Sequence, residues 1–290
     1  MSGDAVQLAL GSVQFGLTYG VVGRGEAVPP SEVREVLALA WESGIRLVDT
    51  APAYGDIEPR LLPLMNMREF EIVSKIPPLP PGASGDAVKS FVVESVWRSV
   101  ERLGPGLRTL LFHRGDDLLG PEGETAWRAI TDTLQGTRIG VGGSFYAPDE
   151  AVRARRRFPI GVAQLPGNVL DQRLADAAAG LEGVEIHLRS VLLQGLLVSA
   201  PEQAGERVPK ALLPLRAWQA WCAQQGVAPL DAALGVARAL PRVSHCIVGV
   251  DRVSQLREIV TAWDRAAPLR APALACADED VIDPRRWKAA

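Results

Sequence analysis

Short apolar stretches alternate with longer helical patterns along the whole chain of 290 residues, and this alternation limits the folds that are open to it. Several stretches are apolar at every position rather than at every second one. That pattern is typical of parallel strands that helices cover on both faces. The candidate strands are residues 6–15, 45–51, 70–76, 108–114, 137–144, 161–166, 183–192 and 244–250.

The segments between these strands carry helical patterns. Ser31 is expected to cap the first helix, whose apolar residues fall on one face. The candidate helices are residues 32–43, 86–102, 121–134, 149–157, 171–180, 209–225, 229–239 and 253–263.

Eight strands alternating with helices predict an α/β fold, the (β/α)₈ barrel (TIM barrel), formed by a single domain over residues 1–290. The alternative is an open doubly wound sheet, which usually carries a GxGxxG motif after its first strand. The nearest sequences are "GVVGRG" at 20–25 and "GVGGS" at 140–144, and neither has that spacing. The barrel is therefore the better prediction, and the proline-rich residues 77–85 are expected to form a loop.

The composition narrows the classes of function. The net charge is −3 and basic residues are mixed with acidic ones, so no basic surface predicts a nucleic-acid partner. No apolar stretch is long enough to span a membrane and no leader pattern is seen, so we expect a cytoplasmic protein. Cys222, Cys246 and Cys276 lie far apart, which argues against a zinc site. His187 and His245 are interpreted as strand or loop residues without catalytic partners.

Polar residues stand where the predicted strands end, which is where barrels of this type carry out chemistry. The second strand ends at Asp49, with Tyr54 in the loop that follows it. The third strand ends at Lys75 and the fourth at His113. An acid, a phenol, an amine and an imidazole are therefore expected to meet at one mouth of the barrel.

These four side chains suit one another chemically. The ordinary pKa of a tyrosine is about 10, and a nearby ammonium group lowers it. A partly buried ammonium group in turn needs a carboxylate partner. We therefore predict that Asp49 pairs with Lys75 and that Lys75 tunes Tyr54 for proton transfer. His113 is predicted to orient a carbonyl group.

Three segments resemble the aldo/keto reductase superfamily in order and spacing: "LVDTAPAYG" at 47–55, "IVSK" at 72–75 and "LLFHR" at 110–114. That superfamily carries a tetrad of Asp, Tyr, Lys and His. The chain most resembles a compact bacterial subset with a "DPRRW"-type tail, often found with sugar metabolism. Further similar segments are residues 8–20, 162–173, 189–197 and 247–259.

The resemblance implies an NAD(P)H-dependent oxidoreductase that interconverts a carbonyl compound (an aldehyde, a ketone or a sugar) and an alcohol, with Tyr54 as general acid and base. It implies no metal. Gln164 would hold the nicotinamide carboxamide, residues 190–194 the pyrophosphate and residues 249–258 the adenosine. The implied cofactor-binding residues are Gly11, Ser12, Ser144, Gln164, Arg189, Ser190, Leu192, Gln194, Gly249, Arg252, Gln255 and Glu258.

The sequence departs from the family pattern near both ends of the implied cofactor site. Arg189 stands where relatives commonly carry an aromatic residue that stacks on the nicotinamide. Relatives mostly prefer NADPH, because basic side chains after the eighth strand pair with its 2′-phosphate. Here Asp251 stands where many relatives carry arginine, with Arg252 and Arg257 nearby. We therefore expect a weak preference for NADP(H), with NAD(H) also accepted.

Other classes of function are open to such a barrel. Some relatives bind the cofactor but act as regulatory or structural subunits with little turnover, and the complete tetrad favours an enzyme instead. A phosphate-binding lyase or isomerase is disfavoured because no glycine-rich loop follows the seventh strand. Gln14, Arg114 and Arg189 make the expected pocket polar, so the expected partner is a small hydroxylated carbonyl substrate such as a sugar.

Overall fold

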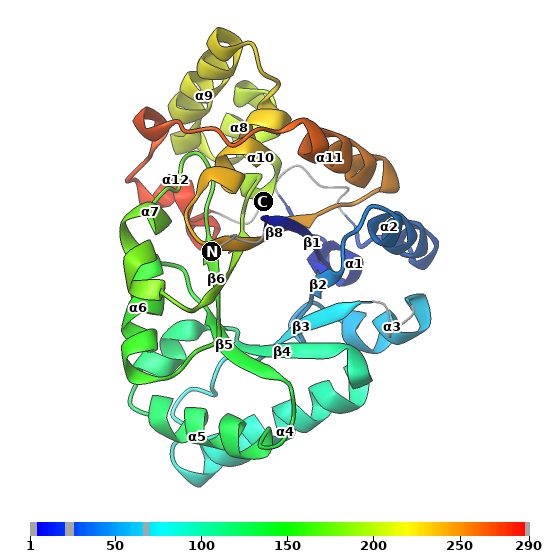
Figure 1. Ribbon diagram of the computed structural model, residues 1–290, viewed down its shortest axis with the longest axis vertical. Helices are drawn as coiled ribbons and strands as arrows, with labels where there is room; N and C mark the ends of the chain where they lie inside the picture. The colour runs from blue at the N-terminus through cyan, green and yellow to red at the C-terminus, as the bar shows by residue number, and fades with distance from the viewer. Residues whose placement is uncertain (1–4, 21–25, 66–69, 288–290) are drawn as a thin grey trace.

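Eight parallel strands close into a barrel in which each strand pairs with the next, and β1 pairs with β8 (Figure 1). The computed structural model describes residues 5–20, 26–65 and 70–287, so all but the first residue of "GVVGRG" lies outside the described residues. The predicted (β/α)₈ barrel is confirmed. The strands are β1 (Gln7–Gly11), β2 (Leu47–Asp49), β3 (Glu71–Ile76), β4 (Leu107–Phe112), β5 (Gly140–Ser144), β6 (Val162–Pro166), β7 (Glu185–Arg189) and β8 (Val243–Gly249).

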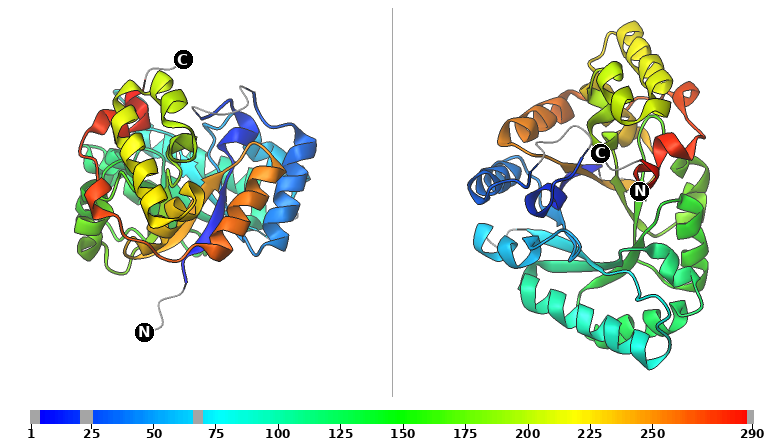
Figure 2. Two further views of the ribbon diagram at one scale, coloured as in Figure 1. Left: turned by 90° about the horizontal axis from the view of Figure 1, so that it is seen from above. Right: turned by 180° about the vertical axis from the view of Figure 1, so that it is seen from behind.

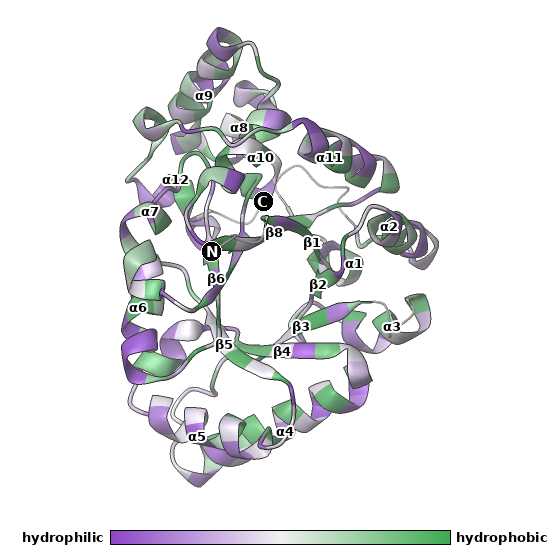
Figure 3. Ribbon diagram, in the orientation of Figure 1, coloured by the Kyte–Doolittle hydropathy of each residue, from purple (hydrophilic) through white to green (hydrophobic). Residues whose placement is uncertain are grey.

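The helices pack around the outside of the barrel (Figures 1 and 2). They carry both hydrophobic and hydrophilic residues (Figure 3), as expected of helices that bury one face. No described helix combines the length and the apolar character that a bilayer crossing requires. The helices are α1 (Val13–Gly16), α2 (Pro30–Glu42), α3 (Ile57–Leu64), α4 (Asp86–Leu103), α5 (Gly123–Thr133), α6 (Pro148–Arg157), α7 (Leu174–Ala177), α8 (Pro201–Arg207), α9 (Leu212–Gln225), α10 (Pro229–Ala239), α11 (Val253–Arg265) and α12 (Glu279–Ile282).

The structure corrects several predicted boundaries. The first strand ends at Gly11, because the chain turns into the single helical turn α1, which buries Phe15. Ser31 does not cap α2. That helix begins at Pro30, whose fixed φ suits the first helical turn. The seventh strand ends at Arg189. Helices α3 and α8 were not predicted, since both are short and contain or begin with proline.

The core has an inner and an outer part. A small apolar cluster fills the barrel itself, and a larger one lies between the strands and the surrounding helices. A separate cluster lies under the long segment between β7 and β8, where the indole N–H of Trp218 donates to the Leu197 carbonyl at 2.8 Å. This separate cluster anchors the segment between β7 and β8 at the mouth of the barrel. The inner cluster contains Ala9, Leu47, Val73, Leu111, Val162 and Ile247.

The glycines of β5 permit a close approach of β6, and this generates a stability prediction. A Cβ on Gly142 would lie 1.9 Å from the carbonyl oxygen of Val162, so Gly142→Ala must push the strands apart. We expect a loss of about 1–3 kcal/mol of unfolding free energy, measured by urea denaturation. Gly140→Ala on the same strand is the control, because its Cβ would meet Thr109 Oγ1 at an ordinary 3.4 Å. Equal losses in the two variants would contradict the steric argument.

Candidate active site

The buried pair of Asp49 and Lys75 lies at the carboxyl ends of β2 and β3. Lys75 Nζ donates to both carboxylate oxygens of Asp49 at 2.8 Å, and to the Thr50 carbonyl at 2.9 Å. Both side chains are almost fully buried. Lys75 and Asp49 therefore lie in the predicted pairing. Each charge compensates the other, and either one would be very costly if it were buried alone.

Gln164 on β6 adds a third group to this pair. Its Nε2 donates to Asp49 Oδ1 at 2.7 Å, while its Oε1 accepts from Ser144 Oγ at 3.2 Å. The two contacts determine which way the amide of Gln164 points. Ser144 thus touches Gln164 rather than the cavity described below.

Tyr54 and His113 lie next to Lys75. Lys75 Nζ is 5.0 Å from the centroid of the Tyr54 ring, and the His113 ring meets the Tyr54 ring edge-on at a centroid distance of 5.8 Å. His113 Nδ1 is buried and has no hydrogen-bond partner among the described residues. The four predicted catalytic side chains therefore form one contiguous group. Arg114 points elsewhere and pairs with Asp117.

Two glycines hold the loop of Tyr54 against α1. A Cβ on Gly16 would lie 1.8 Å from the Tyr54 carbonyl oxygen, and a Cβ on Gly55 would lie 2.6 Å from the Gly16 carbonyl oxygen. Gly55 also has a φ of 69°, which side-chain-bearing residues rarely adopt. The backbone of α1 can therefore pack directly against the loop and fix the position of the Tyr54 backbone.

Burial sets the protonation states of this group. Burial raises the pKa of Tyr54 above its ordinary value, and the opposing effect of the Lys75 ammonium does not cancel it. The predicted lowering of that pKa is therefore wrong in net direction. Burial lowers the pKa of Lys75, but Asp49 and Tyr54 outweigh it and the pKa is raised. Burial, helped by Lys75, lowers the pKa of His113 to about 4. At neutral pH the group is a phenol, an ammonium, a carboxylate and a neutral imidazole.

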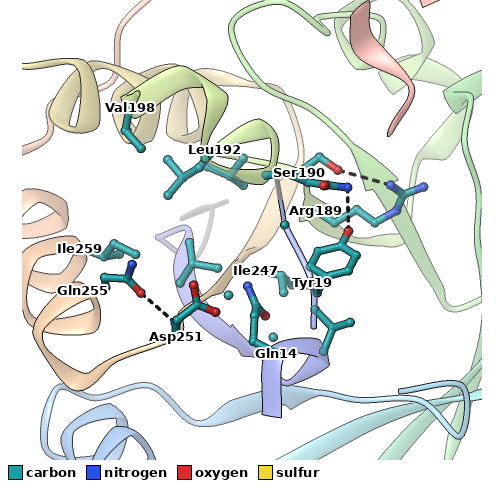
Figure 4. A pocket seen from close by; sticks show the side chains of 18 of the residues that line it. Gln14, Tyr19, Arg189, Ser190, Leu192, Val198, Ile247, Asp251, Gln255 and Ile259 are labelled. Carbon is teal, nitrogen blue, oxygen red and sulfur yellow. Dashed lines mark hydrogen bonds between the residues drawn. The ribbon is translucent and has the colours of Figure 1, made fainter. Parts of the chain in front are cut away.

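Asp49 and Tyr54 line a cavity of about 520 Å³. Figure 4 shows other side chains of its wall, among them Gln14 and Tyr19. Its walls come from β1, from the segment after β7 and from the loop after β8. Neither Ser144 nor Arg252 lines it, and His113 reaches it only through Tyr54. The implied cofactor residues that do line it are Gly11, Ser12, Gln164, Arg189, Ser190, Leu192, Gln194, Gly249, Gln255 and Glu258.

The sequence did not indicate part of the wall. Val198, Leu230 and Ile259 line the cavity, yet each looks like an ordinary apolar helix or loop residue. Tyr19 also lines it, and its hydroxyl accepts from Gln194 Nε2 at 3.2 Å. That contact joins the segment after β1 to the segment after β7 across the mouth, which a pattern along one stretch of sequence cannot show.

The segment after β7 has an unusual backbone. Ser190, Leu193 and Gln194 have φ values of 59°, 47° and 53°, which side-chain-bearing residues adopt at a cost of about 1–3 kcal/mol each. The Asn168 amide donates to the Ser190 carbonyl at 3.1 Å and supports the first of these turns. The turns direct Ser190 and Leu192 toward the cavity (Figure 4), and Gln194 lines it as well.

Buried polar atoms in the wall test whether the cavity suits a polar cofactor. Ser12 Oγ and Gln14 Oε1 are buried, line the cavity and have no hydrogen-bond partner among the described residues. A Cβ on Gly249 would lie 2.5 Å from the Gln14 amide, so the glycine leaves room for that side chain. Buried polar atoms normally have partners. These atoms therefore fit a ligand that supplies hydrogen bonds, as a nicotinamide dinucleotide does.

Solved structures share this architecture. A protein assigned as an aldo-keto reductase from Pseudomonas aeruginosa is 24% identical, with a TM-score of 0.65 over 90% of this chain and 91% of that one. A second such structure from that organism is 25% identical, with a TM-score of 0.65 over 90% of each chain. An aldo-keto reductase from Bacillus halodurans in its holo form is 20% identical, with a TM-score of 0.73 over 97% and 95%.

No curated protein is similar enough to this chain to give a match. The model of the aldo/keto reductase family, in contrast, matches residues 7–272, which is most of the sequence. The chain therefore belongs to the aldo/keto reductase family.

Proposed function

We propose that the protein is an NAD(P)H-dependent oxidoreductase that interconverts a small carbonyl compound and the corresponding alcohol. The observation that carries this proposal is the contact of Tyr54 with the buried Lys75–Asp49 pair, where Tyr54 and Asp49 line the cavity. Membership of the aldo/keto reductase family supports an oxidoreductase of carbonyl compounds. The reaction, the cofactor and the roles of single residues are proposals.

Ser12, Gln164, Ser190, Gln194 and Gln255 are the polar wall residues that would hold a nicotinamide cofactor. When bound, such a cofactor supplies or takes up the hydride. Gln164 is oriented in advance by Asp49 and Ser144, so its remaining N–H can meet a ligand without reorganising.

Tyr54 acts as the general acid in the direction of reduction. Its raised pKa keeps the phenol protonated at neutral pH, so the hydroxyl can give its proton to the carbonyl oxygen of the substrate. The phenolate that forms then lies beside the Lys75 ammonium, which stabilises it, and Asp49 holds that ammonium in place. Neutral His113 meets the Tyr54 ring edge-on and does not itself line the cavity, so we propose that it helps to orient the carbonyl group through its contact with Tyr54.

The substrate that we propose is a small hydroxylated carbonyl compound such as a sugar. Gln14, Tyr19 and Arg189 bring an amide, a phenol and a guanidinium group to the wall. Arg189 makes no ion pair within the described part of the chain, and its Nη2 donates to the Phe145 carbonyl at 3.0 Å. Hydroxyl groups of a sugar can satisfy such groups, whereas an apolar carbonyl compound would leave them unpaired.

The first prediction from this proposal concerns Tyr54. Tyr54→Phe keeps the ring and removes the proton donor, so we expect kcat to fall about 10²- to 10⁴-fold while the Kd of the cofactor stays nearly constant. Turnover is followed by NAD(P)H absorbance and binding by fluorescence titration. Tyr146→Phe is the matched control, because Tyr146 does not line the cavity. A loss below about ten-fold in Tyr54→Phe contradicts the general-acid role.

The same assays separate the enzyme from a cofactor-binding subunit. A regulatory or structural subunit would bind NAD(P)H but turn over no aldehyde, ketone or sugar in a broad panel. In that case Tyr54→Phe would change nothing. No contact in the cavity favours this alternative, because the Tyr54–Lys75–Asp49 arrangement is complete.

The neutral state of His113 generates a second prediction. Its folded pKa of about 4 lies below the ordinary value of about 6.5, so the unfolded chain binds the extra proton first. This contribution to stability is complete above pH 6.5 and is lost as the pH falls toward 4. Between pH 7 and pH 5 it amounts to about 2 kcal/mol.

His113→Asn removes this contribution. Urea titrations at pH 7 and pH 5 give the loss of unfolding free energy on acidification for each protein. We expect this loss to be about 2 kcal/mol smaller in His113→Asn than in the wild type. Every other titratable group is common to both proteins, so its contribution cancels in the comparison. Equal pH dependence in the two proteins would show that His113 is not held neutral.

The third prediction concerns the choice between NADPH and NADH. Asp251 and Glu258 line the cavity, whereas Arg252 does not, and Arg189 is the only basic lining residue in the described chain. The wall therefore offers few positive charges to support the preference for NADPH that the sequence predicts. We expect the Kd values of NADPH and NADH to agree within about ten-fold.

Asp251→Ser should tighten NADPH binding relative to NADH by about five-fold, equivalent to ~1 kcal/mol for one repulsive charge pair. Asp264→Ser is the control, because Asp264 is exposed on α11 and does not line the cavity. Titrations with both reduced cofactors measure the effect. A wild-type preference for NADPH above about a hundred-fold would show that Asp251 does not face the 2′-phosphate.

A further inference from the structure

Two of the three histidines of the chain lie side by side near the amino ends of β7 and β8, away from the cavity. The register pairs His187 with His245, and Glu185 stands two residues before His187 on β7. Ile247, two residues after His245, belongs to the apolar cluster inside the barrel. Because side chains on a strand alternate, His245 also points into the barrel. Both histidines are strand residues, as the sequence indicated, but the sequence did not indicate that they contact each other and Glu185.

One carboxylate oxygen joins the two rings. Glu185 Oε1 is 2.9 Å from His187 Nε2 and 3.3 Å from His245 Nδ1. The ring centroids are 4.9 Å apart, and one donor atom from each of the three residues lies within 4.8 Å of the others. Two ligand atoms that each lie about 2.1 Å from one ion are roughly 3.0–3.4 Å apart when the angle at the ion is about 90–109°. The separations of 2.9 and 3.3 Å from Glu185 Oε1 are therefore close to those of ligands that share an ion.

Hydrogen bonds within the protein satisfy this cluster only in part, since the 2.9 Å contact of His187 Nε2 with Glu185 Oε1 is one such bond. Ser244 Oγ is 3.3 Å from His245 Nδ1, but it donates its own proton to the Ile186 carbonyl at 2.8 Å. His187 Nδ1 is buried without a partner among the described residues. A neutral imidazole carries one N–H, so when His187 gives it to Glu185 its Nδ1 remains an unpaired acceptor. Buried polar groups left in this state call for a further partner.

The charge and exposure of the cluster suit a cation. Glu185 brings a carboxylate to the two imidazoles. Its only ion-pair partners in the described chain are the two histidines, and no Lys or Arg neutralises it. The side chains of His187, His245 and Glu185 are 1%, 18% and 37% exposed. An ion can therefore enter past Glu185 and keep water in its remaining coordination positions.

We propose that Glu185, His187 and His245 form a binding site for one divalent transition-metal ion of the Zn²⁺ type. Two imidazoles and one carboxylate are a ligand set that Zn²⁺ uses in proteins. On β8, the first residue after His245 that lines the cavity is Ile247, about 7 Å along the strand, and it belongs to the apolar cluster inside the barrel. The ion would cross-link β7 to β8 without reaching the catalytic group, so the inference stands independently of the proposed function.

The experiment uses the full chain without an affinity tag, freed of metal by dialysis against a chelator. Zn²⁺ is titrated by calorimetry, and Co²⁺ by its visible absorption bands. We expect one equivalent with a Kd below about 10 µM. His245→Gln and Glu185→Gln should each weaken binding at least about ten-fold. His187 is left unchanged because its near-complete burial makes a folding defect the first result of substitution.

Glu182→Gln is the matched control. Glu182 precedes β7 by three residues, its side chain is 82% exposed and it pairs with Arg242, so this variant should bind Zn²⁺ like the wild type. Thermal unfolding gives a second readout. Zn²⁺ at a hundred times the wild-type Kd should raise the Tm of the wild type and of Glu182→Gln by at least about 2 °C, and that of Glu185→Gln by about half as much or less.

Saturable binding of one equivalent that both site variants weaken supports the site. Absence of binding up to 1 mM Zn²⁺, or undiminished binding in either site variant, overturns it. Carbonyl reduction is measured with and without Zn²⁺ and should stay the same. A protein that binds Zn²⁺ as expected but reduces no carbonyl compound would refute the proposed function while leaving the metal site intact.

Discussion

The candidate active site depends on the buried carboxylate of Asp49. This one side chain at the end of β2 accepts from Lys75 on β3 and from Gln164 on β6, so it fixes groups from three strands. Such a pair adds little net stability, but loss of one partner leaves the other charge uncompensated at a cost of about 3–5 kcal/mol. The hydrogen bonds to Asp49 fix the position of the Lys75 ammonium group. The loop after β2 then places Tyr54 next to that group.

Fold and catalytic group were predictable because their signals are local. Apolar stretches in alternation predict a barrel, and strand ends meet at one mouth whatever the exact boundaries are. The cavity wall was harder to predict, since Tyr19 and Gln194 meet across 175 positions of sequence. The Glu185, His187 and His245 cluster was missed for a similar reason. It depends on the register of β7 against β8, across a long connecting segment that no pattern resolves.

The protonation states show a second limit of sequence reasoning. Lys75 was expected to lower the pKa of Tyr54, and its charge does act in that direction. Burial has the larger effect, and burial depends on how loops from several elements close over the phenol. Residue types predict whether each neighbouring charge raises or lowers a pKa. The net shift also depends on how deeply the group is buried, which only the folded structure shows.

The contact between Gly16 and Gly55 has a consequence for how this enzyme can change. Backbone lies on backbone there, and any side chain would force the Tyr54 loop away from α1. One side of the mouth is thus closed to sequence variation. The other side, where Leu192, Val198 and Leu230 line the cavity, is built from side chains on a separately packed segment. Selection or engineering for new substrates can therefore change that side, while Tyr54 stays in place.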